Sequence, residues 1–93
     1  MKYKVKFSND KMNFDEEFEG ENAQDIVKAM QTLAASKMGK LAGIFVLSLP
    51  PELFAREVIK KYNAEIQKTL ELPDNCEEFL ATGTREGILI PLI

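Results

Sequence analysis

The residues after Met1 alternate between lysine and apolar side chains, and this alternation restricts the fold more than any other feature of the chain. Residues 2–7 read Lys-Tyr-Lys-Val-Lys-Phe. A period of two is typical of a strand that has one buried face and one solvated face. The pattern therefore predicts a strand whose inward side chains are Tyr3, Val5 and Phe7, in a sheet that is covered on one side.

A second alternating segment, residues 12–18, predicts an antiparallel partner for this strand. Asn9 and Asp10 lie between the two segments, and both residue types tolerate the left-handed backbone of a tight hairpin turn. With the turn at these two residues, apolar side chains face apolar ones and lysines face carboxylates. The expected cross-strand pairs are Phe7 with Met12, Val5 with Phe14, Lys4 with Asp15 and Lys2 with Glu17.

Two longer helices are expected where apolar residues recur at helical spacing. The first follows Asn22, a good N-cap residue, and ends before Gly39. The second covers residues 52–70 and starts after Pro50 and Pro51, because proline suits a first helical turn.

The last third of the chain predicts a short helix and a strand. Asp74 would cap this helix and Gly83 would end it. Residues 87–93 are mostly apolar and predict a C-terminal strand. Pro91 cannot donate a ladder hydrogen bond, so the strand should lie at a sheet edge or leave the pairing there.

Residues 41–49 are the ambiguous segment. They are almost entirely apolar, and such a short run fits either a buried strand or a buried helical turn. The β-branched and aromatic residues between Ile44 and Leu47 favour a strand. The sequence therefore predicts one α+β domain over residues 1–93. Its small, mainly antiparallel sheet would contain the hairpin, this middle strand and the C-terminal strand, with two or three helices on one face.

Histidine is absent from the chain, and Cys76 is its one cysteine. Ser-His-Asp and Cys-His catalysis and Cys/His zinc sites are therefore excluded. No spacing singles out a pair of carboxylates for acid–base work, which depends on geometry. We expect a protein that is not an enzyme, with no catalytic residue, no metal ligand and no cofactor.

Three features that could carry chemistry have simpler structural interpretations. Cys76 has acidic neighbours that disfavour a thiolate, so it is expected to be structural. Residues 83–87 contain two glycines but precede a strand, whereas phosphate loops usually precede a helix. The acidic residues near the hairpin would be spread over two strand faces and neutralised by lysines. They are Asp15, Glu16, Glu17, Glu19, Glu21 and Asp25.

Partners are expected to be proteins. The net charge of −3 gives no bulk attraction for nucleic acid. The preferred hypothesis is a small interaction or regulatory module that binds a protein partner. The alternative is a nucleic-acid-associated regulator that uses a basic strip on helix 52–70. This strip consists of Arg56, Lys60, Lys61 and Lys68.

Self-association through the C-terminal strand is a further expectation. Its residues are too apolar to lie in water on both faces, so either a helix or a second copy should cover them. The expected homodimer surface consists of Phe79, Leu80, Ile88, Leu89, Ile90, Leu92 and Ile93.

The compartment is expected to be the cytoplasm, without membrane contact. A lone cysteine suits a reducing environment. The longest apolar run, residues 41–49, is too short to span a bilayer, and residues 1–7 lack the apolar core of a signal peptide.

Overall fold

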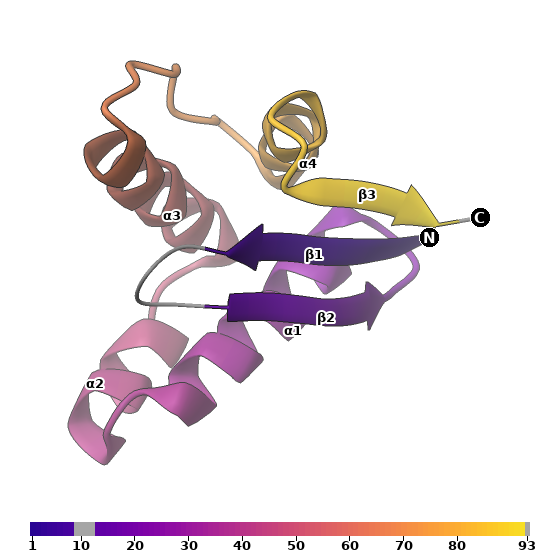
Figure 1. Cartoon of the computed structure of the whole chain (residues 1–93). Coiled ribbons are helices and arrows are strands. Elements are labelled where there is room, and N and C mark those ends of the chain that lie inside the picture. The colour runs from indigo at the N-terminus through magenta and orange to yellow at the C-terminus, as the bar shows by residue number, and fades with distance from the viewer. Residues whose placement is uncertain (9–12, 93) are drawn as a thin grey trace.

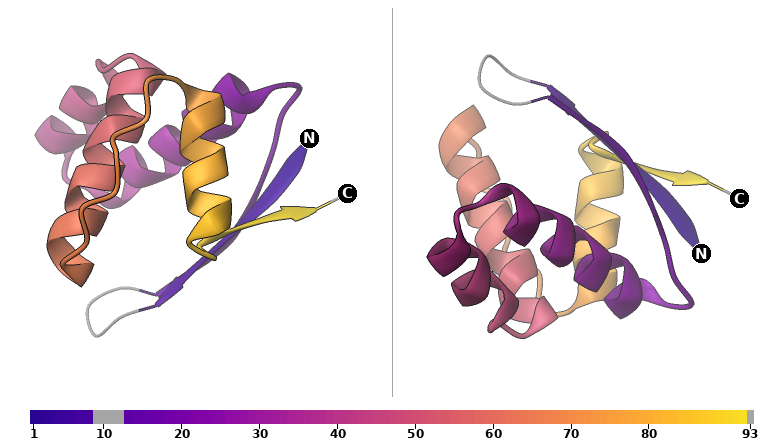
Figure 2. Two further views of the ribbon diagram at one scale, coloured as in Figure 1. Left: turned by 90° about the horizontal axis from the view of Figure 1, so that it is seen from above. Right: turned by 90° about the horizontal axis from the view of Figure 1, so that it is seen from below.

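The computed structural model describes residues 1–8 and 13–92, which form an open sheet and the helices around it (Figure 1). The strands are antiparallel in the order β2–β1–β3, and the helices lie on one side of the sheet (Figure 2). The expected α+β class is confirmed. The elements are β1 (Lys2–Ser8), β2 (Asn13–Glu19), α1 (Ala23–Lys37), α2 (Lys40–Leu47), α3 (Pro51–Ile66), α4 (Cys76–Arg85) and β3 (Leu89–Leu92).

The β1–β2 hairpin forms, but its predicted register is wrong by two residues. Lys4 faces Glu17 and Val5 faces Glu16, so the numbers of facing residues sum to 21 and not to 19. The shift is even, so Tyr3, Val5 and Phe18 stay on the face predicted for them. The turn predicted at residues 9 and 10 lies outside the described residues.

The two ion pairs predicted for the hairpin form across diagonals of the ladder. The Nζ atom of Lys2 lies 3.3 Å from an oxygen of Glu17, and that of Lys4 lies 3.2 Å from an oxygen of Asp15. Long side chains reach diagonal as well as facing neighbours. The charge pattern was therefore compatible with both registers and could not distinguish them.

Backbone hydrogen bonds along β1 alternate between its two neighbours. Met1 and Gly20 exchange hydrogen bonds on the β2 side, whereas the N–H of Lys6 donates to the carbonyl oxygen of Ile88 at 2.9 Å. Since antiparallel strands bond a neighbour at every second residue, the backbone groups of Leu89 and Pro91 point to the outer edge of β3. Pro91 has no N–H, so this edge lacks a donor there.

The core lies between the inner face of the sheet and helices α1, α3 and α4. Ile26, Val27 and Ile59 are completely buried. Leu89 faces Val5 across the ladder and packs against α4. Ile90 faces Lys4 and therefore lies on the open, lysine-bearing side of the sheet. Other core residues are Ala23, Met30, Phe54, Ala55, Cys76, Phe79 and Leu80.

The middle strand predicted over residues 41–49 is wrong, because residues 40–47 form helix α2. Both edges of β1 are taken by β2 and β3, so a further strand could join only at the outer edges of the sheet. An apolar run of this length follows its tertiary surroundings more than its propensity. Here those surroundings are the side of α1.

Two helix boundaries differ from their predictions. Helix α3 ends at Ile66 because Gln67 adopts a left-handed backbone with φ of 56°. Asn63 then exchanges two hydrogen bonds, of 3.0 and 3.1 Å, with the backbone of Leu70. Helix α4 continues past Gly83, whose hydrogen atoms leave room for the side chain of Leu89.

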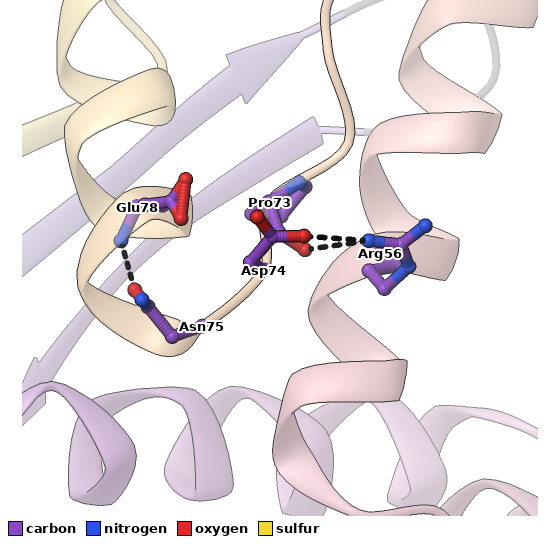
Figure 3. A network of polar contacts seen from close by, with 5 residues as sticks. All are labelled: Arg56, Pro73, Asp74, Asn75 and Glu78. Carbon is purple, nitrogen blue, oxygen red and sulfur yellow. Dashed lines mark hydrogen bonds and ion pairs between the residues drawn. The ribbon is translucent and has the colours of Figure 1, made fainter.

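The N-cap of α4 is Asn75, one residue after the predicted Asp74. The Asn75 Oδ1 atom accepts the N–H of Glu78 at 2.8 Å. The Arg56 guanidinium donates to the Pro73 carbonyl at 3.1 Å and to Asp74 Oδ1 at 3.4 Å (Figure 3). A side chain of α3 therefore engages Asp74 and orients the segment that leads into α4.

Candidate functional site

The apolar residues of α2 lie on the surface of the protein. Leu41, Ile44 and Phe45 are 87%, 66% and 68% exposed. At 3.6 residues per turn these positions share one side of the helix. Gly43 and Val46 occupy the opposite side, where Gly43 contacts α1 and Val46 packs on the core.

We call this exposed region the α2 surface. It contains the outer row of α2 and the exposed apolar side chains that precede and follow this helix in the sequence. Its residues are Met38, Leu41, Ile44, Phe45, Leu47 and Leu53. Apart from Met1 and Ile90, these are the exposed large apolar side chains of the described residues.

Helix α2 rests on α1 through Gly43. A Cβ atom at this position would lie 2.7 Å from the carbonyl oxygen of Ala35. Only glycine allows the two backbones to approach this closely. Gly39 supplies the short connection between the helices and has no neighbour within 4 Å of its own Cβ position.

The C-terminal end of α2 is held by Gln31, a side chain of α1 that is only 4% exposed. Its Nε2 atom donates to the carbonyl oxygens of Val46 at 2.7 Å and Leu49 at 2.9 Å. The last carbonyls of a helix need outside donors. Pro50 and Pro51 follow directly and have no N–H to give. Gln31 therefore supplies a donor to the Leu49 carbonyl and a second one to the Val46 carbonyl, which also accepts the N–H of Leu49 at 3.2 Å.

These contacts make the α2 surface a preformed apolar platform. Its inner side is fixed by the close contact at Gly43 and the hydrogen bonds from Gln31. Its outer side has no apolar cover within the described residues. Figure 1 shows α2 at an end of the molecule remote from β3 and the C-terminus. Such a surface can bind through apolar contact and carries no catalytic group.

The residues predicted for self-association are divided between the core and the surface. Phe79, Leu80 and Leu89 are buried in the core, because α4 covers the inner face of β3. The sequence analysis expected either a helix or a second copy of the chain to cover this strand. On its inner face the cover is a helix of the same chain. Ile88 and Leu92 are half-buried, Ile90 is exposed, and Ile93 lies outside the described residues.

The basic strip predicted on α3 is largely paired with carboxylates of the same chain. The nearest nitrogen–oxygen distances are 3.4 Å for Arg56 with Asp74, 3.2 Å for Lys60 with Glu57 and 2.6 Å for Lys68 with Glu86. Lys61 is exposed. Phosphate contacts would have to compete with these pairs. The geometry therefore does not favour the nucleic-acid hypothesis.

The Cys76 thiol lies in the core and is 3% exposed. Burial, followed by the nearby carboxylates of Glu52 and Glu77, raises its pKa. A reactive cysteine needs a lowered pKa and access to solvent. The structural interpretation made from the sequence agrees with this environment.

The turn over residues 83–87 is the plain helix-to-strand connection that the sequence indicated. Its N–H groups are used within the turn: those of Glu86, Gly87 and Ile88 donate to carbonyls of α4. Gly87 has a φ of 79°, which glycine adopts without strain. The backbone donors of this turn are therefore already occupied and do not form an anion site.

The acidic segment also has internal partners. Asp15 and Glu17 pair with the lysines of β1. Asp25 belongs to the start of α1, where its carboxylate accepts the N–H of Glu21 at 3.1 Å and its N–H donates to Asn22 at 2.9 Å. Among residues 1–8 and 13–92, no group of three or more potential ligand side chains could hold a metal ion.

Glu86 joins the end of α3 to the end of α4. Its Oε1 atom accepts from Lys68 Nζ at 2.6 Å and from the Tyr62 hydroxyl at 3.2 Å. The hydrogen bond from Lys68 lowers the pKa of Glu86, while burial and the Glu86 carboxylate raise the pKa of Tyr62. The contacts of this cluster tie two elements together.

A shallow depression lies beside α4 and the segment that precedes it. It is lined by Glu71, Leu72, Pro73, Glu78, Thr82 and Arg85. Four of these six side chains are polar, and Arg85 donates to Thr82 Oγ1 at 3.4 Å, so the lining is not that of the apolar cavity typical of a small-molecule site. In the described part of the chain, no helix has the length and hydrophobicity to cross a bilayer.

Comparison of the chain with protein-family models, curated proteins and solved structures gave no match. The candidate site therefore rests on its own geometry. Sequence reasoning recognised residues 41–49 as apolar but assigned them to the interior. The available signal was that no polar residue recurs at regular spacing in this run. This signal indicates that the run is buried, but it does not show whether the rest of the fold or a partner buries it.

Proposed function

We propose that this protein is a small interaction or regulatory module that binds a protein partner through the α2 surface. The observation that carries the proposal is the exposure of Leu41, Ile44 and Phe45 on the outer side of a helix whose residues after Lys40 are all apolar. Helices of this composition are normally buried. Contiguous exposed apolar surface is uncommon on monomers and marks interaction sites.

The energy available from covering this surface supports the proposal. Burial of one large apolar side chain is worth about 1.5–3 kcal/mol. The α2 surface has six such side chains, each at least 44% exposed. Its platform is already ordered by Gln31 and Gly43, so little conformational entropy is lost on binding.

The test compares the wild-type protein with the double variant Leu41→Gln/Phe45→Gln. The matched control is Ile90→Gln, which also replaces an exposed apolar residue but lies on the open face of the sheet. Each protein is used to capture partners from an extract of the native host, and the captured protein is then purified and titrated against all three. Urea unfolding checks that each variant is folded.

The proposal requires a protein that binds the wild type and the Ile90→Gln variant and is lost from the α2 variant. Equal binding to all three proteins would place the interaction elsewhere. Equal loss from both variants, with stability unchanged, would show that general surface hydrophobicity and not the α2 surface is recognised.

A further inference from the structure

We propose that the partner seated on the α2 surface is a single amphipathic helix whose apolar row is flanked by carboxylates. This inference rests on the proposed docking function and specifies the chemistry of what docks. Three observations support it: the spacing of the exposed residues, the size of the surface and the distribution of charge around it.

The spacing of the exposed residues suits a helix. Leu41, Ile44 and Phe45 stand at positions i, i+3 and i+4, and Ser48 continues the row at i+7. This is the row that one helix presents to another when their side chains interdigitate. Amphipathic helices are recognised through anchors of the same spacing. The eight residues of α2 are about 12 Å long, which matches two turns of a partner helix.

The size of the surface favours one helix over a second copy of this chain. A stable protein–protein interface uses about 800 Å² and 20–30 residues from each partner. The α2 surface provides six apolar side chains. The outer edge of β3 adds little, because Pro91 removes a backbone donor from it.

The charge along the segment that carries most of the surface is positive. Residues 26–51 contain Lys28, Lys37 and Lys40 and no acidic residue, although the chain has 15 acidic residues in all. Lys40 is exposed and is the first residue of α2. Complementary charge sets the choice and orientation of partners. Carboxylates beside the apolar row of the partner are the groups that this stretch would attract.

The same charges disfavour the other occupants. In a two-fold pairing of α2 surfaces, residues 26–51 of the second copy would bring no carboxylate to Lys40. Anionic membranes are recognised by clusters of about four to eight basic residues. This stretch has three, in a chain of net charge −3.

The experiment uses two synthetic helical peptides with the same leucine row at positions i, i+3, i+4 and i+7. Glutamates flank the row in one peptide and lysines in the other. Each is titrated into the full chain at low and high salt, with fluorescence anisotropy for affinity and amide chemical shifts for location. The glutamate peptide should bind at least about fivefold more tightly at low salt, with shifts in α2, and salt should narrow the difference.

A charge-reversal pair of variants locates the preference. Lys40→Glu places an acid at the start of a helix, where it is well tolerated, and should reduce or reverse the preference between the peptides. Lys61→Glu makes the same change of charge on an exposed residue of α3 and should leave the preference intact. A preference that survives Lys40→Glu would overturn the proposed carboxylate recognition.

The remaining outcomes separate this inference from the proposed function. Equal binding of both peptides at α2 overturns the acidic partner and leaves the docking function standing. No binding of either peptide, while the α2 variant still loses its captured partner, overturns the single helix alone. Two results would replace the helix with another occupant: a dimer in sedimentation that Leu41→Gln/Phe45→Gln dissociates, or binding to phosphatidylserine vesicles that the same variant abolishes.

Discussion

Gln31 illustrates how one buried polar residue can determine where a helix lies. Its amide donates to two carbonyls at the end of α2, beside Pro50 and Pro51, which cannot donate. A buried acceptor that is left without a donor lowers the stability of the fold by about 1–3 kcal/mol. The position of the α2 surface therefore depends on a residue that lies outside it.

Replacing Gln31 with leucine should lower the free energy of unfolding by about 1–3 kcal/mol. Gln31→Glu keeps the size but removes both donors, and should be at least as destabilising at neutral pH. Part of the loss should return in acid, because a protonated carboxyl can donate once. Urea unfolding at two pH values measures this. Gln24→Glu, on the exposed side of α1, is the control. An equal loss of stability in this variant would contradict the role given to the hydrogen bonds from Gln31.

Glu86 should make the stability of the protein dependent on acid pH. Its pKa is lowered from 4.5, chiefly by the hydrogen bond from Lys68. A lowered pKa means that the folded state holds the proton less tightly than the unfolded chain does, so the contribution is complete above pH 4.5 and is lost as pH falls through the lowered pKa.

The difference in unfolding free energy between wild type and Glu86→Gln should accordingly be largest near neutral pH and shrink in acid. Urea titrations across this range provide the measurement. Glu71→Gln, at an exposed position in the connection between α3 and α4, is the control for the removal of a carboxylate. A difference for Glu86→Gln that is independent of pH would show that the carboxylate contributes by packing alone.

At the level of elements, the sequence predicted what local patterns determine. Alternation identified β1 and β2, and Asn22 marked the start of α1, because these signals are contained in neighbouring residues. The register was missed because diagonal ion pairs satisfy the same charges. Asp74 and Asn75 are both competent caps, and the choice depends on Arg56 from a distant helix.

Helix α2 could not be predicted because its environment is non-local. Whether residues 41–49 pair with β1 depends on β3, which comes more than 40 residues later. The exposure of Leu41, Ile44 and Phe45 was invisible for a related reason. An apolar run without polar alternation does not mark the side that faces water, so the candidate site was assigned to the core.

Gly43→Ala should destabilise the protein by about 1–3 kcal/mol, because the added Cβ atom would meet the Ala35 carbonyl oxygen and push α2 from α1. Helix propensity alone predicts the opposite sign, a gain of up to about 1 kcal/mol. Gly39→Ala is the matched control, since its Cβ position is open, and should change stability little. Thermal unfolding of both variants shows whether each substitution raises or lowers the stability. A stabilised Gly43→Ala variant would show that the two helices can separate freely.

For the whole molecule, the edges of the sheet govern whether copies of the chain associate. Association through β3 was expected from its apolar residues, and the homodimer stays a prediction. Strand pairing between copies at β3 would be weak, because Pro91 removes one N–H donor from its outer edge. The exposed side chain of Ile90 lies on the open face beside Lys4 and not at this edge.

Pro91→Val should increase self-association, because it restores an outward N–H and favours extended backbone. Sedimentation at micromolar concentrations should then show dimers or larger species that the wild-type chain forms less readily. Ile90→Val is the control, since the backbone of residue 90 already bonds β1. Unchanged sedimentation of Pro91→Val would show that proline is not what protects this edge.

The pairing of β1 with β3 has a consequence for synthesis of the chain. Lys2 lies opposite Leu92, so β1 receives its second neighbour from a strand that is synthesised long after β2. Until those residues are released, the N-terminal hairpin remains a two-stranded ribbon, which is marginally stable by itself. The even-numbered amides of β1, which bond β3, should therefore gain protection later than its odd-numbered amides in pulse-labelling during synthesis.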